Sequence, residues 1–170
     1  MNAITRTNIR LSIATIFLTG VLAVPVSAQR QASITGEVQG QESDRMQGGP
    51  PPTCPPASIC VDGSVLGQAT HIGRFTLAYK VTVTLPAGNS AGAATLTAPN
   101  GDEIFTTIVG QGIGVPNTAT LNTVMEVNAV TGGTGRFEGV SGYLIVYRLI
   151  DLATGLTSGS IIGSLTLPAR

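Results

Sequence analysis

The chain has no tryptophan, one histidine, two cysteines and few charged residues, and each shortage excludes a class of protein. Aromatic residues make up 4% and charged residues 11% of the 170 residues. Because there is no basic cluster, the electrostatic footprint of a nucleic-acid-binding protein is missing, and we expect no nucleic-acid partner. The 42% hydrophobic content is too high for a disordered chain. We therefore expect a folded domain, and the 22 glycines suit packed strands and tight turns.

The single histidine, His71, limits the catalytic chemistry that the chain offers. A Ser-His-Asp triad would have to use it, yet no Gly-x-Ser-x-Gly motif is present. Asp102 and Glu103 are adjacent, so they point to opposite faces of a strand, which does not suit paired acid-base work. Two cysteines and one histidine also make a poor zinc ligand set. We expect no metal and no cofactor, and the sequence leaves open whether the protein is an enzyme.

Residues 1–28 have the layout of a secretory signal peptide. Arg6 and Arg10 precede an apolar stretch from Leu11 to Val26, and a small-residue cleavage site follows. A membrane anchor is the alternative, but the stretch is shorter than the about 20 residues that a spanning helix needs. No cysteine follows the apolar run, which disfavours a lipoprotein anchor. We expect cleavage after Ala28 and a secreted or periplasmic protein.

The remaining chain, residues 29–170, has the length of a single domain with one hydrophobic core. It carries seven basic and nine acidic residues. Once in an oxidising compartment, Cys54 and Cys60 are expected to form a disulfide rather than a metal site. The disulfide would close a polar, Pro-rich insertion at about residues 40–58, which has too many prolines for a sheet.

The remaining chain shows no convincing helical period, whereas short β-rich runs follow one another with Gly, Pro and Asn between them. Residues 74–85 are the clearest run, and an Asn-Gly pair at residues 100–101 predicts a hairpin turn. About eight strands are predicted, at residues 32–39, 59–67, 74–85, 93–98, 102–109, 119–130, 142–152 and 158–167. This segmentation is typical of an all-β antiparallel barrel or sandwich.

Alternation along two of these strands predicts which side chains face the interior. In residues 74–85 one face is apolar and the other mostly polar, so the apolar face is expected inside. In residues 142–152 both faces are mainly apolar, and the tyrosines are expected to point inward, as ligand contacts or as ordinary core aromatics. The ligand-pocket candidates from the two strands are Phe75, Leu77, Tyr79, Val81, Tyr143 and Tyr147. A strand that is apolar on both faces needs a cover outside, which predicts a homo-oligomer, with a trimer as one form.

Glu126 and Asn128 alternate with apolar residues in the predicted strand 119–130. Exposure on the outer wall is the favoured interpretation, because Asp and Glu are rarely fully buried. Inside a cavity, the carboxylate could instead assist a reaction by moving protons. Both residues are therefore also candidates for the ligand pocket.

The stretch TGGTGRFEGVSGYLIV, residues 131–146, places five glycines before an apolar run. A phosphate-binding loop would need a helix after it, and here a strand is expected. The glycines are therefore expected to supply positive-φ turns and a corner of the sheet, with one phenylalanine plugging the end of the core. The residues of this structural motif are Gly132, Gly133, Gly135, Arg136, Phe137 and Gly142.

The same stretch resembles a segment of the allene oxide cyclase and dirigent superfamily, whose members share a Gly-Gly-Thr-Gly-x-Phe run before a late barrel strand. GQATHIGRFT, residues 67–76, is similar to an early strand of uncharacterised bacterial secreted proteins with similar barrels. The resemblance implies an eight-stranded antiparallel barrel with an apolar cavity, often trimeric. Within that superfamily the cyclases steer a reactive epoxide and the dirigent proteins orient radical-derived intermediates. No catalytic residue of the superfamily can be placed on this chain.

Three functions are compatible with such a barrel. The first is a secreted protein of unknown specific activity that binds or orients a small apolar ligand in its lumen. The second is an allene oxide cyclase-like isomerase or cyclase, and the third is a structural or surface module with a filled barrel. An outer-membrane barrel is not expected, because the chain is poor in the aromatic residues of a girdle and the polar face of residues 74–85 is unsuited to lipid. We therefore expect no membrane contact after signal cleavage.

Overall fold

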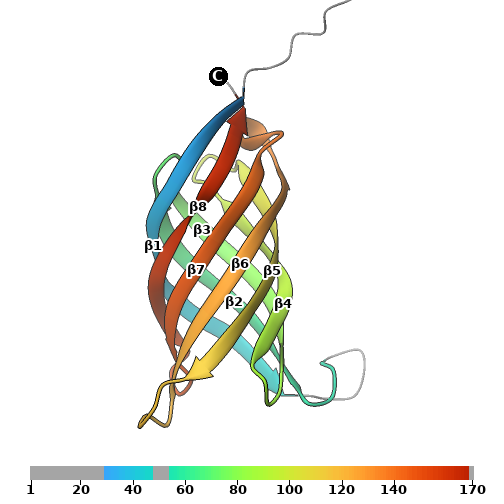
Figure 1. Cartoon of the computed structure of the whole chain (residues 1–170), viewed down its shortest axis with the longest axis vertical. Helices are drawn as coiled ribbons and strands as arrows, with labels where there is room; N and C mark the ends of the chain where they lie inside the picture. Colours follow the sequence, from blue (N-terminus) through green and yellow to red (C-terminus); the bar gives the residue numbers. More distant parts are fainter. Residues whose placement is uncertain (1–28, 48–53, 169–170) are drawn as a thin grey trace, which may run out of the picture.

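Eight antiparallel strands close into a barrel in the computed structural model, which describes residues 29–47 and 54–168 (Figure 1). The strands follow one another around the barrel in chain order, and β1 pairs with β8 to close it. Their bounds are β1 Gln29–Gln47, β2 Ser58–Ala69, β3 Gly73–Thr84, β4 Asn89–Thr97, β5 Glu103–Gly114, β6 Leu121–Gly133, β7 Ser141–Asp151 and β8 Leu156–Pro168. The predicted eight-stranded antiparallel barrel is confirmed, and the sandwich alternative is wrong.

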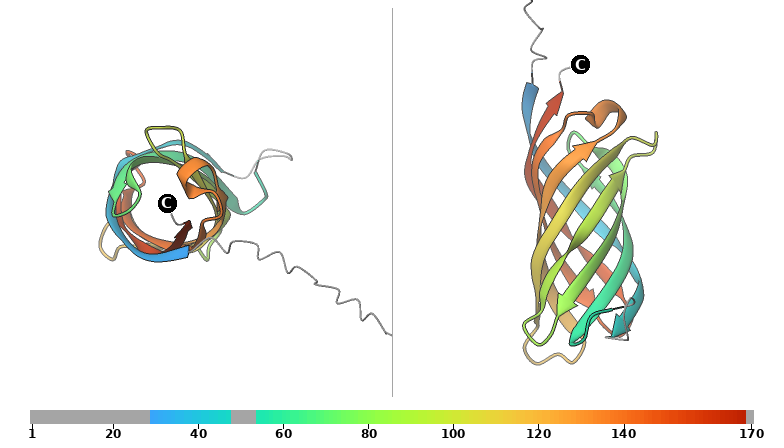
Figure 2. Two further views of the ribbon diagram at one scale, coloured as in Figure 1. Left: turned by 90° about the horizontal axis from the view of Figure 1, so that it is seen from above. Right: turned by 90° about the vertical axis from the view of Figure 1, so that its right-hand side faces the viewer.

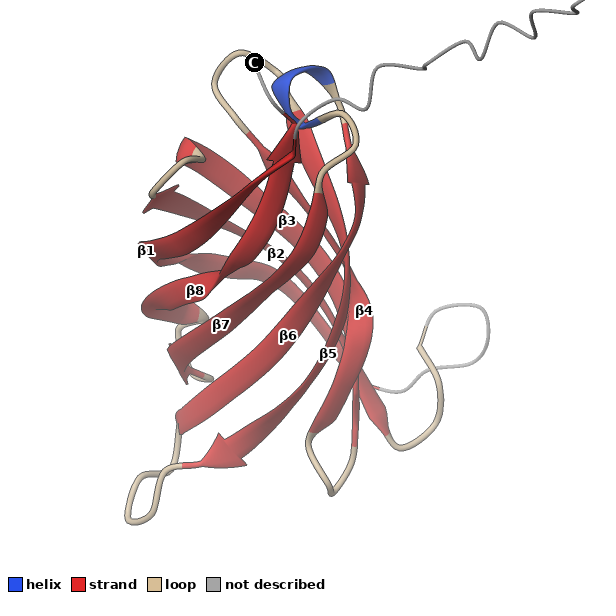
Figure 3. Ribbon diagram, turned by 45° about the horizontal axis from the view of Figure 1, so that its top comes forward, coloured by secondary structure: helices blue, strands red, loops and turns tan. Residues whose placement is uncertain are grey.

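One short 3-10 helix, η1 (Gly135–Phe137), is the only helix in the part of the chain that the structure describes (Figure 3). It lies at the rim of the barrel, which appears as a closed ring when viewed end-on (Figure 2). No helix among these residues could span a membrane. The predicted signal peptide, residues 1–28, lies outside the described residues.

Two strands are longer than the sequence pattern predicts. β1 continues to Gln47, so residues 40–47 belong to the wall and not to a Pro-rich insertion. β5 continues to Gly114 through residues that were expected to form a loop. Both extensions are rich in polar residues or glycine and pair through backbone hydrogen bonds, which leave no periodic signal in the sequence.

The end of the barrel where β1 begins and β8 ends is uppermost in Figure 1, and we call it the upper end. It is filled with apolar side chains. Phe137 of η1 and Ile72 of the β2–β3 turn are only 2% and 1% exposed. The inward residues that surround them come from six of the eight strands: Ile34, Phe75, Leu77, Leu96, Ile104, Leu144 and Leu165. An eight-stranded barrel is just wide enough for such side chains to fill it.

Glycines on the inner face make room for large neighbours. A Cβ at Gly67 would overlap the ring of Phe75 on the adjacent strand, and a Cβ at Gly63 would overlap the ring of Tyr79. A narrow barrel can therefore hold an aromatic ring only where the facing residue has no side chain.

The glycine-rich segment between β6 and β7 forms the upper rim. Gly135 and Gly139 have positive φ angles of 55° and 77°, and Gly132 and Gly142 also have positive φ. Arg136 donates from Nη2 to the backbone oxygen of Ile72 over 2.6 Å, and its Nε lies 3.7 Å from Oδ2 of Asp102. Arg136 therefore ties three connections of the barrel together at this end.

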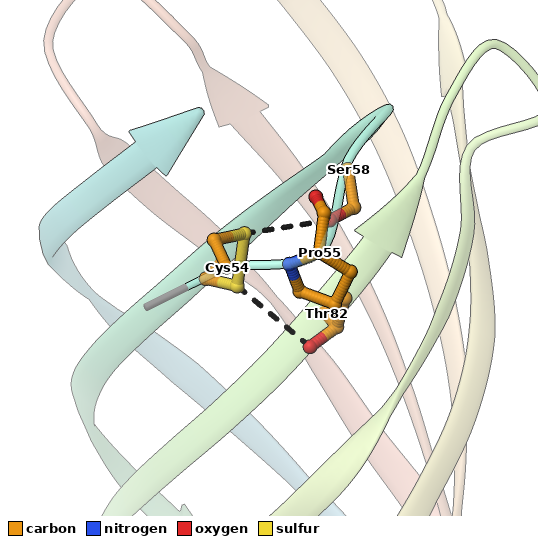
Figure 4. The surroundings of a disulfide bond; sticks show 5 residues. Cys54, Pro55, Ser58 and Thr82 are labelled. Atoms are coloured by element: carbon orange, nitrogen blue, oxygen red, sulfur yellow. Dashed lines mark hydrogen bonds between the residues drawn. A yellow bond between two sulfur atoms is a disulfide. The ribbon is translucent and has the colours of Figure 1, made fainter. Parts of the chain in front are cut away.

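A disulfide between Cys54 and Cys60 lies at the opposite, lower end of the barrel (Figure 4). Cys54 is buried, and its Sγ lies 3.4 Å from Oγ of Ser58, the first residue of β2. The Sγ of Cys60 lies 3.9 Å from Oγ1 of Thr82 on β3. The bond therefore fixes the segment that enters β2 against the rim of the lower end.

Candidate functional site

A cavity of about 270 Å³ opens at the lower end of the barrel, and we call it the lower cavity. The apolar part of its wall is aliphatic, with no aromatic side chain among the described residues that line it, and the polar lining residues are Glu42, Ser90, Asn122, Glu126 and Arg148. The apolar lining comes from β2, β3, β6 and β7 and from the two rim loops: Ile59, Val61, Val81, Val83, Leu85, Pro86, Val124, Ile150 and Leu152.

Two glycines of β5 leave the lower cavity open. A Cβ at Gly112 would lie 3.7 Å from the nearest atom, a methyl of Val124, and a Cβ at Gly114 would lie 3.6 Å from Oδ1 of Asn122. These are ordinary contact distances, unlike the overlaps at Gly63 and Gly67. Gly112 and Gly114 therefore leave space in the lower cavity that a ligand can occupy.

Four buried polar side chains, Glu42, Tyr79, Glu126 and Arg148, separate the lower cavity from the filled upper end, and we call them the polar layer. Arg148 extends from β7 between the carboxylates of Glu42 on β1 and Glu126 on β6. It donates from Nη1 to Oε1 of Glu42 over 2.8 Å. It also donates from Nε and Nη2 to the two oxygens of Glu126, over 3.3 and 3.4 Å. This two-bond pairing fixes the plane of the guanidinium.

Tyr79 completes the polar layer from β3. Its hydroxyl accepts a hydrogen bond from Nη1 of Arg148 over 3.0 Å and donates one to Glu42 over 3.3 Å. The guanidinium carbon of Arg148 also lies 4.8 Å from the centre of the Tyr79 ring, within the range of a cation–π interaction. The phenol is therefore held on two sides by charged groups.

Burial and neighbouring charges keep the protons of this layer in place. Burial is the main reason that the pKa of Tyr79 is raised well above its ordinary value, although the charge of Arg148 opposes the rise. Burial alone would lower the pKa of Arg148, but the negative charge of Glu126 and the other partners outweigh it, and that pKa is raised as well. Both groups therefore stay protonated, so they act as fixed hydrogen-bond donors.

Ser90 and Asn128 are also polar side chains on the inner face of the barrel, and each has an atom without a hydrogen-bond partner in the part of the chain that the structure describes. Ser90 of β4 lines the lower cavity, is 7% exposed, and its Oγ has no hydrogen-bond partner among the described residues. Asn128 lies above the polar layer, where its Oδ1 accepts a hydrogen bond from Thr106 over 3.2 Å. The Nδ2 of Asn128 has no partner among the described residues. Ser90 therefore faces a ligand space, whereas Asn128 does not line it.

The structure distributes the pocket candidates of β3 over the two ends of the barrel. Phe75 and Leu77 belong to the filled upper end, Tyr79 lies in the polar layer and Val81 lines the lower cavity. All four point inward. Only the later half of the strand therefore reaches a space that a ligand can enter.

The favoured interpretation that Glu126 and Asn128 face solvent is wrong. Both point inward and are buried, with exposed fractions of 4% and 2%. The general rule that carboxylates avoid the core fails here because Arg148 supplies a buried partner for Glu126. Glu126 lines the lower cavity.

The expectation that Tyr143 and Tyr147 point inward is also wrong. They lie on the outer wall with 48% and 43% of their surface exposed, whereas Leu144, Val146 and Arg148 point inward. Both faces of β7 are largely apolar, so alternation could not choose between them. Arg148, Glu42 and Ser90 were not predicted from the sequence, and the one available signal was that Glu42 and Glu126 need a cation if they are buried.

Comparisons with known proteins support the fold and give no closer relationship. No protein-family model matches the chain, and no curated protein matches it. Among solved structures, the pterocarpan synthase dirigent protein PsPTS1 superposes with a TM-score of 0.54 at 14% sequence identity, over 83% of this chain and 97% of that one. The pterocarpan synthase dirigent protein GePTS1 matches with a TM-score of 0.36 at 12% identity, over 92% of this chain and all of that one. The chain thus has a dirigent-like barrel fold.

Proposed function

We propose that this protein binds a small apolar ligand in the lower cavity and fixes its orientation through the polar layer. The observation that carries the proposal is an aliphatic cavity that ends on buried, mutually bonded polar groups. The aliphatic wall favours an apolar ligand body by the hydrophobic effect. The polar layer offers fixed donors and acceptors at the inner end of the cavity, so it favours one orientation of the ligand.

A purely structural module with a filled barrel is less well supported. The upper end shows that these strands can be packed completely, because Phe137 and Ile72 close it. At the lower end Gly112 and Gly114 replace side chains that would reduce the cavity. An open cavity beside a filled core favours a binding function over a scaffold.

An isomerase or cyclase is the second candidate function, since a polar group does lie inside the barrel. Tyr79 and Arg148 keep their protons, so neither suits proton exchange at ordinary pH. Glu126 is the group that could assist, but both of its oxygens accept hydrogen bonds from Arg148. The arrangement therefore favours holding and orienting a ligand over acid-base catalysis. The dirigent-like fold accords with an orienting role, whereas the synthase activity in the name of PsPTS1 belongs to that protein.

Ligand binding can be tested with Gly112→Val, which adds a side chain to the wall of the lower cavity. We expect the wild-type protein to bind a hydrophobic dye in the cavity and to retain a ligand in native mass spectrometry. Gly112→Val should lose both signals, because its methyl groups occupy the ligand space. Ala78→Val, on the exposed outer face of β3, is the matched control and should bind as the wild type does. Equal dye binding by all three proteins, or none by any, would contradict the proposal.

We also propose that the protein is exported and processed after Ala28. The Cys54–Cys60 disulfide is compatible with an extracellular protein, because disulfides persist in oxidising compartments. Intact-mass measurement of the exported protein should give a chain that begins at Gln29. A product that retains residues 1–28 would instead favour the membrane-anchor alternative.

A homo-oligomer is proposed on the outer wall of β5 to β8. An apolar row crosses all four strands in register: Ile162, Ile145, Val127 and Val109. Exposed Tyr147 and Met125 flank this row. Away from the strand ends these four outer faces carry no charged side chain, whereas the outer faces of β1 to β3 carry Glu37, Asp62, Arg74 and Lys80. A second copy of the chain is the occupant that we propose, because large exposed apolar patches are rare on monomers.

Light scattering tests the association. The wild-type protein should be oligomeric at micromolar concentration, and Ile145→Lys at the centre of the apolar row should shift it to a monomer. Ala78→Lys, on the exposed outer face of β3 and away from β5 to β8, is the control and should leave the assembly unchanged. A wild-type protein that is monomeric under these conditions would refute the proposal.

A further inference from the structure

The search for a ligand-recognition residue leads to Ser90, whose hydroxyl is buried and unpartnered at the edge of the lower cavity. Burying a hydroxyl without a hydrogen bond costs roughly 1–3 kcal/mol, so an orphan of this kind calls for an explanation. Only 7% of the surface of Ser90 is exposed, and its Oγ has no hydrogen-bond partner among the described residues. It lines the lower cavity, which places the missing partner in the ligand space.

Ser90 lies on one rung of the barrel with Glu126. Ser90 pairs with Gly110 on β5, and Gly110 pairs with Glu126 on β6, so all three face inward at the same level. A Cβ at Gly110 would lie 2.9 Å from Oγ of Ser90 and 2.7 Å from Cγ of Glu126. Both side chains therefore converge over Gly110, and both line the same level of the lower cavity.

The hydrogen-bonding capacity of this space is defined by the two groups. Each oxygen of Glu126 accepts one hydrogen bond from Arg148, and a carboxylate has about four acceptor sites, so acceptor capacity remains. The Ser90 hydroxyl can donate one hydrogen bond. A ligand group that donates to Glu126 and accepts from Ser90 satisfies both, and an alcohol O–H does so with a single oxygen atom.

We propose that Ser90 and Glu126 form a hydroxyl-binding subsite, so that the lower cavity selects neutral alcohols with an aliphatic body. The inference rests on the proposed ligand-binding function and names the chemical class of its ligand. A carboxylate ligand is disfavoured, because it would meet the carboxylates of Glu42 and Glu126 while the guanidinium of Arg148 is already bonded to both. The aliphatic wall offers no aromatic stacking partner among its described residues, so a saturated chain or ring is the better match.

Three eight-carbon probes test the donor half of the subsite: 1-octanol, its isomer heptyl methyl ether, and octanoate. Calorimetric titration of the wild-type protein should give an affinity for 1-octanol at least about tenfold higher than for the ether, which cannot donate to Glu126. Octanoate should bind more weakly than either. Equal binding of alcohol and ether, or preferred binding of octanoate, would overturn the inference.

Ser90→Ala tests the other half. It should lower the affinity for 1-octanol by about fivefold or more, whereas Ser160→Ala on the exposed outer face of β8 should leave it unchanged. Circular dichroism and dye binding report whether Ser90→Ala remains folded with an open cavity. An unchanged affinity in a folded Ser90→Ala variant would mean that only water occupies the subsite, and this would refute the inference. If no probe and no dye bound the wild-type protein, the proposed function itself would fail.

Discussion

The two ends of the barrel share the same eight strands and the same inward alternation, yet one is filled and the other is open. At the upper end the space opposite a glycine is taken by a ring, as Phe75 takes the space at Gly67. At the lower end Gly112 and Gly114 face nothing closer than 3.6 Å. The strand pairing thus determines the wall, whereas the inner side chains determine whether the lumen holds a core or a cavity.

The polar layer lies between the two ends and depends on both. Its charges are removed from water on the side of the filled core, so each needs a protein partner. On the side of the lower cavity the same groups can contact a ligand. The layer therefore closes the filled core that lies above it, and it also forms the polar end of the lower cavity.

Breaking the polar layer should have the largest effect. Arg148→Met keeps an apolar stem in place but leaves two buried carboxylates and the Tyr79 hydroxyl without their shared donor. We expect the free energy of unfolding to fall by about 3–5 kcal/mol, measured by urea denaturation. The cause can be separated from a packing defect with the triple variant Arg148→Met, Glu42→Gln and Glu126→Gln. The triple variant removes the charges together and should recover part of the loss, and a triple variant that is less stable than Arg148→Met would show that charge is not the reason.

Truncation should cost more at the filled end than at the open one. Phe137→Ala removes a ring that is 2% exposed and leaves a void at the upper end, so we expect a loss of about 3 kcal/mol. Val83→Ala removes methyl groups that already border the lower cavity and should cost about 1 kcal/mol or less. Both losses of unfolding free energy should be measured by denaturant titration at equal protein concentration. Equal losses would mean that the lower cavity is collapsed in solution.

The sequence predicted the wall better than it predicted the site. The alternation of residues 74–85 identified the inner face of β3 because its outer face carries Arg74, Lys80 and several threonines. The same reasoning failed for β7, where both faces are apolar and local alternation could not tell that Leu144 points inward. The periodicity of a strand therefore predicts its inner face only where its two faces differ in polarity.

The polar layer could not be predicted because its members come from four strands that are far apart in sequence. Glu42 and Arg148 are separated by 106 residues, and no local pattern links them. Glu42 also lies in a stretch that was expected to be a loop, so it was not considered as an inward residue. Single-residue burial statistics predict exposure for Glu42, Glu126 and Arg148 taken one at a time, whereas the three are buried together with Tyr79.

A pair of glycine variants compares the two ends at the level of a single methyl group. A Cβ at Gly36, on β1, would overlap the backbone oxygen of Gln68, which cannot move without disturbing the pairing of β1 with β2. Gly36→Ala should therefore lower the unfolding free energy by about 1–3 kcal/mol. Gly112→Ala has room at 3.7 Å and should change stability by less than about 0.5 kcal/mol. A comparable loss in both variants would show that the spaces at the two ends do not differ in this way.

The smallest expected effect is an alkaline one that isolates Tyr79. Its pKa is raised in the folded protein, so its contribution to stability is fully present below the unfolded pKa of about 10 and is lost as the pH rises toward the folded value. The unfolding free energy should therefore fall by up to about 1 kcal/mol per pH unit above about pH 10 from this residue alone. Tyr79→Phe should be less stable near neutral pH and should show a shallower alkaline slope. Tyr147→Phe, on the outer wall, is the control and should keep the wild-type slope, because its hydroxyl is not enclosed by the polar layer. Parallel slopes for the wild type and Tyr79→Phe would mean that the Tyr79 phenol is open to solvent. The polar layer would then not separate the filled end of the barrel from the open end.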